Sequence, residues 1–249
     1  MKATTLGSIF AGLMLAPALM AQAEPGNLSL IFTVGAKPGM EKQFEEAIKK
    51  HAAWHRQQND SRSYNVFSVA YGYGSGSYIA VYPGVRLADL DKNAKLEQAD
   101  NDHYLANVAQ FTESFKAEVA VRSAELSTLP LTAPVKPMSV VTFSHLHPGK
   151  AADWNLYARA LKDAAEKASP KPEYFVSTRT MSDELPTVAF VRPVNQFAEM
   201  TPLPIDDLLT KAYGAQQAAN LTQMRDNATH CLKRSILVHR PDLSYAPGK

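Results

Sequence analysis

The feature that most constrains this chain is an internal duplication with a spacing of 110 residues. The same turn and strand residues recur at that spacing, without a gap, in two parts of the sequence. The first set is Pro38-Gly39, Tyr64, Val66, Val81 and Pro83, and the second set is Pro148-Gly149, Tyr174, Val176, Val191 and Pro193. A period this long indicates one supersecondary unit copied twice, because solenoid repeats span only about 20 to 50 residues. Two such copies can pair within one chain and enclose a cavity.

Both copies show the same order of expected elements, β-α-β-β-α-β. Runs of β-branched and aromatic residues predict the strands, and apolar residues at helical spacing predict the helices. In the first copy we expect strands at 28–34, 64–71, 77–82 and 119–126, with helices at 40–58 and 96–115. In the second copy we expect strands at 140–146, 174–181, 187–192 and 231–238, with helices at 151–168 and 205–228. This order is that of the split βαβ, or ferredoxin-like, unit.

The beginning of the chain is typical of a signal peptide. Lys2 is followed by an apolar stretch from Leu6 to Met20, and Ala21-Gln22-Ala23 fits the small-x-small rule for cleavage. The alternative, a transmembrane anchor, requires a longer apolar stretch. We therefore expect residues 1–23 to be removed and the mature protein to be exported, either to a periplasm or out of the cell.

The rest of the chain divides into two modules of about 100 residues each. We place the first module at 24–127, a proline-rich linker at 128–137 and the second module at 138–249, with a loose tail after Pro241. The charge is close to balanced, with 26 Lys and Arg against 24 Asp and Glu, and no basic run stands out. Nucleic acid is therefore not an expected partner, because it requires clustered positive charge. No further stretch after the leader is long and apolar enough for a membrane span.

This pattern resembles the dimeric α/β-barrel (ferredoxin-like) superfamily, in a tandem-duplicated form. The resemblance lies in topology and in the strand–turn–helix rhythm of 28–239, and no specific family is assigned. It implies an α+β fold in which two tandem ferredoxin-like modules pack their sheets face to face as an α/β barrel. The sequence leaves open whether that barrel forms within one chain or across a homodimer. Members include cofactor-independent oxygenases of polyphenols and quinols, haem-binding and haem-degrading enzymes, and stress-response proteins.

Seven residues are candidates for ligand binding. Arginines on predicted strands lie either on a solvated face, in a structural ion pair or in a cavity that holds an anion. A strand-end histidine can line the cavity of such a barrel or lean into solvent, and tyrosines in a hairpin either pack across strands or contact an aromatic ligand. The candidates are His145, Arg179, Arg192, Arg234, Arg122, Tyr71 and Tyr78.

His51 and His55 stand four residues apart, which places two imidazoles on one helix face, as metal ligation requires. No third ligand is evident from the sequence, and His51 aligns with Leu161 of the second copy, a core position. We therefore expect the rings to be packed, His51 partly buried and His55 nearer the surface, with a metal or haem site as the alternative.

These observations predict an exported small-molecule-binding protein that holds an aromatic or anionic ligand between two sheets. We expect no resident cofactor, with haem as the alternative. Two other functions stay open: a cofactor-independent oxygenase or haem-handling enzyme in the same cavity, and a protein–protein interaction module that uses an exposed sheet or strand edge.

Overall fold

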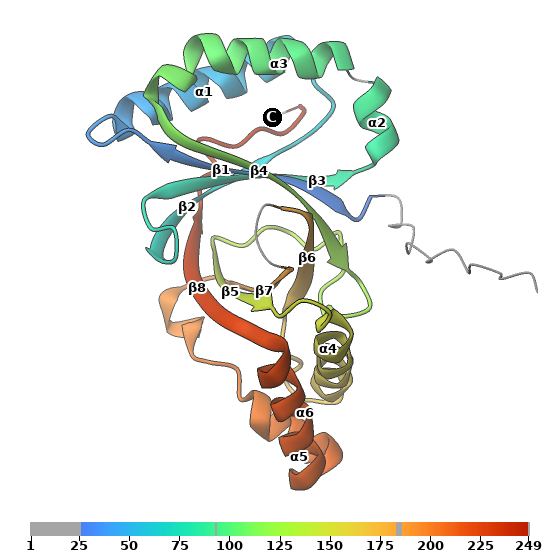
Figure 1. Ribbon diagram of the computed structural model, residues 1–249. Helices are drawn as coiled ribbons and strands as arrows, with labels where there is room; N and C mark the ends of the chain where they lie inside the picture. The colour runs from blue at the N-terminus through green and yellow to red at the C-terminus, as the bar shows by residue number, and fades with distance from the viewer. Residues whose placement is uncertain (1–25, 93, 183–185, 249) are drawn as a thin grey trace, which may run out of the picture.

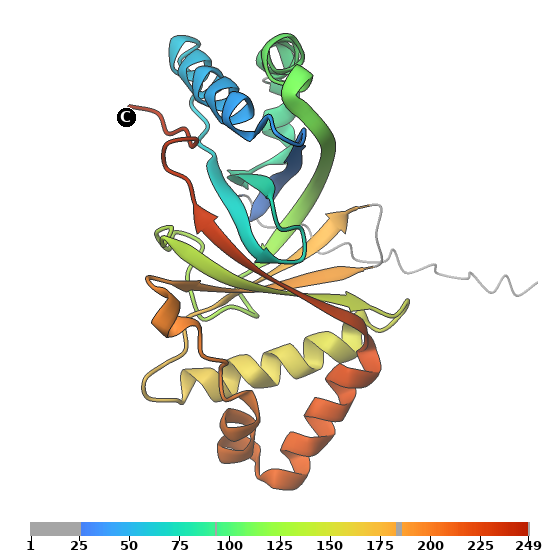
Figure 2. The same ribbon diagram turned by 90° about the vertical axis from the view of Figure 1, so that its left-hand side faces the viewer.

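The fold is a β-barrel whose two opposite outer faces are each covered by a layer of helices, as two views of a computed structural model show (Figures 1 and 2). The structure describes residues 26–92, 94–182 and 186–248. The expected leader, residues 1–23, lies outside the described residues. Within the described ranges, no helix has the length and apolar character needed to span a bilayer.

The first half of the chain forms one βαββαβ module. Its elements are β1 (Leu28–Ala36), α1 (Glu41–Gln57), β2 (Asn65–Gly72), β3 (Ser77–Val85), α2 (Leu87–Lys92), α3 (Ala94–Asn107), the 3-10 turn η1 (Ala109–Phe111) and β4 (Thr112–Ser123). The repeated Pro-Gly turn precedes α1, and Gly39 has a φ of 79°, a left-handed conformation that glycine adopts without steric cost. α1 turns Phe44, Ala47 and Ala52 toward the sheet at helical spacing.

The second half repeats the module, again with three α-helices and one 3-10 turn among the described residues. Its elements are β5 (Met138–Leu146), α4 (Ala151–Glu166), β6 (Phe175–Met181), β7 (Thr187–Val194), the 3-10 turn η2 (Phe197–Met200), α5 (Ile205–Tyr213), α6 (Ala215–Ala228) and β8 (Thr229–His239). Gly149, the counterpart of Gly39, has a φ of 77°. The predicted helical stretch 205–228 is two helices, because the chain turns sharply at Gly214.

The eight strands form one closed barrel in the order β1-β3-β2-β8-β5-β7-β6-β4. Within each half the strands follow the ferredoxin-like order, and the halves join where β2 pairs with β8 and β4 pairs with β6. The sheets of the two modules therefore face each other as predicted, and they are also joined by strand pairing at both of their edges. The barrel forms within one chain. Each strand has two neighbours, so the barrel leaves no free strand edge, which removes strand-edge recruitment as the basis of the interaction-module hypothesis.

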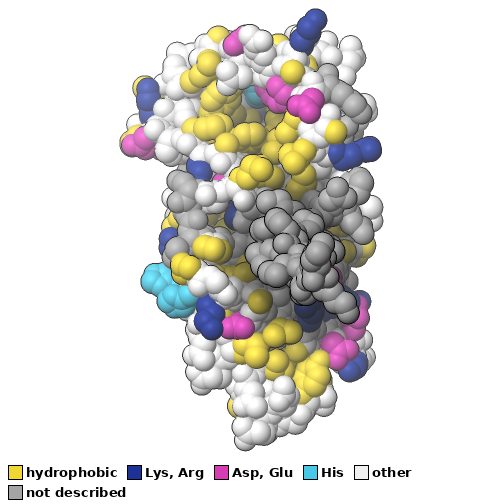
Figure 3. All heavy atoms as spheres, turned by 45° about the vertical axis from the view of Figure 1, so that its right-hand side comes forward, with side chains coloured by type: hydrophobic (Ala, Val, Ile, Leu, Met, Phe, Trp, Pro, Cys, Tyr) yellow, Lys and Arg dark blue, Asp and Glu magenta, His cyan; other side chains and the backbone are white. Residues whose placement is uncertain are grey.

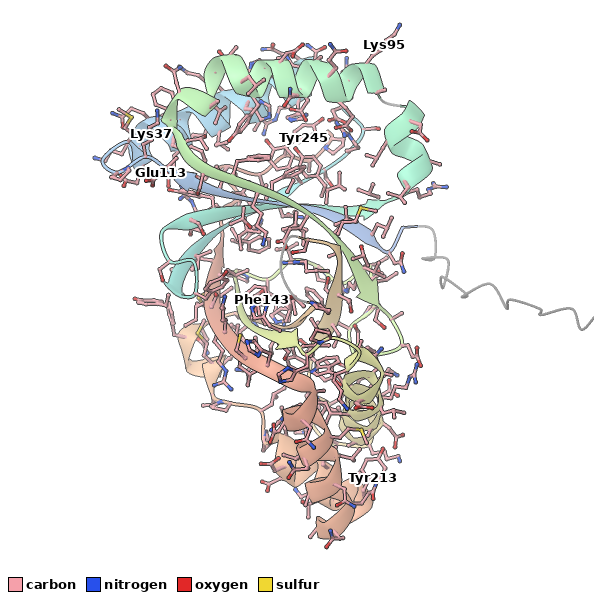
Figure 4. All side chains as sticks on the ribbon, viewed as in Figure 1. Lys37, Lys95, Glu113, Phe143, Tyr213 and Tyr245 are labelled. Carbon is pink, nitrogen blue, oxygen red and sulfur yellow. The ribbon has the colours of Figure 1, made fainter. Side chains whose placement is uncertain are left out.

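Three apolar cores follow from the alternation of side chains along the strands. The barrel interior contains Val69, Val141, Val191 and Leu237, with Phe143 packed against them. Figure 4 shows Phe143 within the barrel. The other two cores lie on the outside of the barrel, where α1 and α3 cover the first half and α4, α5 and α6 cover the second half.

The segment after Pro241 is packed, so the prediction of a loose tail was wrong. Leu243 is fully buried and Tyr245 is 3 % exposed, both in the core of the first half. Tyr245 exchanges two backbone hydrogen bonds with Tyr64, which adds a short bridge to the start of β2. The tail thus runs back from the second half and lies between the sheet and helices of the first (Figures 1 and 4).

The boundary between α3 and β4 also differs from the prediction. The apolar spacing predicted helix as far as Phe115, but the helix ends at Asn107 and the strand begins at Thr112. β4 pairs with nearly all of β1, from Leu28 opposite Val121 to Ala36 opposite Thr112. The hydrogen bonds of this long tertiary pairing override the local helical pattern.

Candidate functional site

One sizeable cavity lies outside the barrel, between the sheet of the second half and its helices. Its volume is about 440 Å³, within the range usual for small-molecule sites. Strands β5, β7 and β8 form one wall, α4 and α6 another, and the segment from Met200 to Ile205 runs along its side. We call this space the arginine cavity, after Arg192, Arg225 and Arg234, which line it together with apolar and aromatic side chains.

The alternation of the strands places these side chains. Along β5, Val140, Thr142 and Ser144 line the arginine cavity, whereas Val141 and Phe143 face the barrel interior. On β8, Arg234 lies opposite Thr142 in the register with β5, so it shares that outward face. The aromatic contribution comes mainly from α4 and β7, through Trp154, Tyr157 and Phe190.

The three arginines of the cavity differ in their partners. Arg225 forms an ion pair with Asp226, Nη2 to Oδ1 at 2.7 Å, and its guanidinium lies 5.5 Å from the centre of the Tyr157 ring. Arg192 and Arg234 make no salt bridge with any residue that the structure describes. Burial lowers the pKa of Arg192, yet a guanidinium stays charged at neutral pH. The cavity therefore carries positive charge that the described protein does not neutralise.

Trp154 adds a second unsatisfied group. Its indole Nε1–H is buried, and it has no hydrogen-bond partner among the described residues, although the side chain lines the cavity. Indole can only donate, and an unpaired buried donor costs about 1–3 kcal/mol. Burial raises the pKa of Tyr157, so its hydroxyl keeps its proton at neutral pH. The polar groups of this cavity are thus chiefly donors, which suits a ligand rich in acceptor oxygens.

The barrel interior forms a smaller cavity of about 240 Å³, and two predicted arginines line it. Arg179 is buried beside Glu118, with its Nε 3.4 Å from Glu118 Oε2. Arg122 stacks 4.0 Å above the centre of the Phe175 ring and donates hydrogen bonds to the carbonyls of Pro130 and Leu131 in the linker. Both guanidinium groups therefore already have partners within the chain.

The other predicted residues are spread over the molecule. Tyr71, 60 % exposed, lies at the edge of the arginine cavity. Tyr78 is buried against Phe44 and donates a hydrogen bond to Glu45. Burial, and then this hydrogen bond, raise the pKa of Tyr78 to about 12. His145 is buried near the end of β5, with Nδ1 2.9 Å from Thr187 Oγ1, and lines neither of these cavities.

His51 and His55 lie in the first half, far from the arginine cavity. Both are buried, and His55 is fully so, which differs from its expected place near the surface. Trp54 stacks parallel to His51, which is the predicted packing. Asp100, from α3, meets the two imidazoles and forms with them a cluster of three possible metal ligands.

Sequence reasoning missed Trp154 and Arg225 of the arginine cavity and Asp100 of the histidine cluster. Trp154 was predicted only as an inward residue of a helix, which it is. The spacing Asp100-x-x-His103 was a usable signal for Asp100, because residues three apart share a helix face.

Comparisons with solved structures agree on the architecture. An anthrone oxidase-like protein matches with a TM-score of 0.58 at 14 % identity, over 91 % of this chain and 96 % of that one. A chlorite dismutase from Candidatus Nitrospira defluvii matches with a TM-score of 0.52 at 8 % identity, over 87 % and 92 % of the two chains. The chain shares the fold of these proteins, a closed α/β barrel of two tandem ferredoxin-like modules.

A further match to the tandem barrel is a protein from Lactobacillus acidophilus NCFM that is provisionally described as a monooxygenase. Its TM-score is 0.52 at 11 % identity, over 89 % of this chain and 96 % of that one. No protein-family model and no curated protein matches the sequence. At these identities the likeness concerns the fold alone, and function must be argued from the site.

The lining of the arginine cavity does not fit the haem alternative. Haem iron is held by His, Cys, Met or Tyr side chains. Among the described residues the lining contains no His or Cys, and its remaining candidates are Met200, Tyr71 and Tyr157. Methionine holds haem together with a histidine, which this lining lacks among those residues. Tyr157 keeps its proton because burial raises its pKa, and Tyr71 is largely exposed. We therefore derive no function through haem at this site.

Proposed function

We propose that the tandem barrel is an exported small-molecule-binding protein whose ligand is an aromatic anion, held in the arginine cavity. The observation that carries the proposal is the set of donors that face the cavity: the buried Trp154 indole N–H, which has no partner among the described residues, and the guanidinium groups of Arg192 and Arg234, which make no salt bridge there. A carboxylate or similar anion supplies the acceptors that these donors lack. Export rests on the leader predicted from the sequence.

The apolar lining supports an aromatic body for the ligand. Trp154, Tyr157 and Phe190 present ring surfaces, and Leu161, Val176 and Ile236 are among the aliphatic residues around them. Rings stack favourably on such surfaces, and guanidinium groups bind carboxylates with two parallel hydrogen bonds. The cavity therefore pairs an apolar surface for a ring system with a positive patch for an acidic substituent.

The barrel interior is the less suitable of the two cavities. It has about half the volume, about 240 Å³ against about 440 Å³. Arg179 has Glu118 beside it, and Arg122 is held by the linker carbonyls and the Phe175 ring. A ligand there would have to displace existing interactions, whereas a ligand in the arginine cavity would satisfy groups that have none. The oxygenase alternative stays a prediction of the fold resemblance.

The test uses 1-naphthoate as the probe and its uncharged amide as the matched neutral compound. We expect isothermal titration calorimetry to show that naphthoate binds more tightly than the amide. Each of Arg192→Gln and Arg234→Gln should weaken naphthoate about 10- to 100-fold, because a charged hydrogen bond contributes about 1.5–3 kcal/mol. Binding of the amide should change much less.

Two control variants locate the site. Arg159→Gln removes an arginine on α4 that is 52 % exposed and paired with Glu125, so it should leave naphthoate binding unchanged. Arg122→Gln removes an arginine of the barrel interior. The proposal fails if naphthoate does not bind, if Arg192→Gln and Arg234→Gln have no effect, or if only Arg122→Gln weakens binding, which would place the ligand between the sheets.

A further inference from the structure

Two histidines and an aspartate converge in the helix layer of the first half. His51 and His55 lie one turn apart on α1, and Asp100 faces them from α3. The Nε2 atom of His51 is 3.0 Å from Asp100 Oδ1, and the Nε2 atom of His55 is 3.4 Å from the same oxygen. The three ligand atoms all lie within 4.8 Å of one another.

Each imidazole is oriented through its other nitrogen. The Nδ1–H of His55 donates to Asp60 Oδ2 at 2.9 Å, and Arg62 holds that carboxylate with hydrogen bonds to both of its oxygens. The Nδ1 of His51 is 2.9 Å from the Nδ1 of His103, so one ring donates to the other. For His55, and for His51 in the tautomer whose Nδ1–H donates to His103, this leaves Nε2 without a proton, which is the arrangement that supports metal-binding histidines.

The tail and α1 hold the rings in place. Tyr245 stacks on His55 with ring centres 5.4 Å apart, and its hydroxyl donates to the backbone carbonyl of Asp60 at 2.6 Å. On the other side Trp54 stacks on His103 with ring centres 5.0 Å apart. The buried C-terminal tail, which Figure 4 shows through Tyr245, thus helps to position the cluster.

Two of the three distances between the ligand atoms match a coordination sphere. Zinc binds nitrogen and carboxylate oxygen at about 2.0–2.2 Å, so two ligand atoms of a tetrahedral site stand roughly 3.3 Å apart. The two nitrogen–oxygen distances of 3.0 and 3.4 Å span that value. An ion-pair network explains the cluster less completely, because it leaves the buried Nε2 of His55 with a 3.4 Å contact to Asp100 Oδ1 but no hydrogen bond among the described residues.

One side of the cluster opens on a cavity. His51 and Asp100 line a space of about 230 Å³ whose other walls include Phe32, Tyr64 and Tyr82. The Tyr64 hydroxyl is buried without a hydrogen-bond partner among the described residues. A phenol carries its proton at neutral pH, so this hydroxyl can donate. Three protein ligands beside an open space are typical of catalytic metal sites, whereas structural zinc sites are closed by four.

We propose that His51, His55 and Asp100 bind a divalent transition-metal ion, with an open coordination position that faces this aromatic cavity. The set of two histidines and one carboxylate suits Zn²⁺ and Fe²⁺. The open position takes water or an oxygen atom of a small aromatic molecule, and the Tyr64 hydroxyl is available to donate to it. This site lies in the other half of the chain from the arginine cavity and does not depend on the function proposed there.

The experiment measures binding of Zn²⁺ and Co²⁺ to the mature protein after treatment with EDTA. We expect one Zn²⁺ per chain by titration calorimetry, and a visible absorption spectrum of low-coordinate Co²⁺ that Zn²⁺ abolishes. Asp100→Asn and His55→Gln should each weaken Zn²⁺ binding at least 100-fold. Asp60→Asn, which removes the carboxylate that orients His55, should weaken it about 10- to 100-fold.

The matched control is the other histidine pair. His147 and His230 lie with ring centres 5.1 Å apart, near β5 and β8, and could bind a metal adventitiously. The double variant His147→Gln, His230→Gln should keep full Zn²⁺ affinity. Circular dichroism checks that each variant folds. Should His55→Gln fail to fold, Asp100→Asn still decides, because the Asp100 side chain is partly exposed and the change is isosteric.

Three results would overturn the proposal. They are a wild-type protein that binds neither ion, an Asp100→Asn variant that binds Zn²⁺ as tightly as the wild type, and loss of binding in the His147, His230 double variant. The Co²⁺ spectrum of the wild-type protein needs no variant, so the first result can be obtained directly.

Discussion

Leu243→Ala tests whether the tail is part of the first core. Leu243 is fully buried, although it lies in the last ten residues of the chain and packs in the first half. Removing a fully buried leucine side chain costs about 2–5 kcal/mol in the free energy of unfolding. In a protein of this size, each kcal/mol lowers Tm by about 2–4 °C. We therefore expect Tm to fall by roughly 4–20 °C.

The assay is urea and thermal unfolding of the wild type, Leu243→Ala and Leu105→Ala. Leu105 is 58 % exposed on α3, so its truncation should change the unfolding free energy by less than about 0.5 kcal/mol. If Leu243→Ala is as stable as Leu105→Ala, the tail does not pack as described, and the loose tail expected from the sequence is the better description. A large loss confined to Leu243→Ala supports the packed tail.

Two further predictions concern contacts between the halves. Two hydrogen bonds from Arg240, at 2.5 and 2.8 Å, hold the pKa of Glu45 below its ordinary 4.5, so the stability from this pair is present above that pH and lost as the pH falls. Arg240→Gln should cost on the order of 1 kcal/mol at pH 7 and much less near pH 3, measured by urea unfolding. Gly72→Ala should destabilise by several kcal/mol in thermal unfolding, because a Cβ there would lie 2.1 Å from the Arg234 carbonyl oxygen. Gly76→Ala, with the same φ of 87° but open space around it, should cost clearly less, and equal losses would show that the contact is unimportant.

The architecture could be predicted because its signals are local. Turn residues at Pro38-Gly39 and Pro148-Gly149, strand patterns and element order are each visible within a few residues, and the ferredoxin-like strand order follows from them. The tail could not be predicted in this way. Leu243 and Tyr245 stand in a short polar segment, and their burial depends on a space that α1 and β2 form nearly 200 residues earlier in the chain.

The site residues show the same contrast between features with a local sequence signal and features that depend on long-range pairing. Arg122-Ser123 and Arg234-Ser235 match in sequence and both lie on a last strand, yet Arg122 lines the barrel interior and Arg234 lines the outer cavity. The partner on the neighbouring strand shows the face: Arg122 lies opposite Ser177, which lines the barrel interior, whereas Arg234 lies opposite Thr142, which lines the outer cavity. Sequence patterns identify strand arginines, whereas the face depends on pairing over long distances.

The closed order of the strands has a consequence during synthesis. β2 pairs with β8, and β4 pairs with β6, so both partners of the first half lie downstream in the chain. The first half leaves the ribosome before either partner exists, and it then carries two unpaired strand edges. At this stage, a nascent chain is open to edge pairing with another copy of itself. Pairing with β6 and β8 then closes both edges, and in the finished barrel the linker residues line the interior cavity.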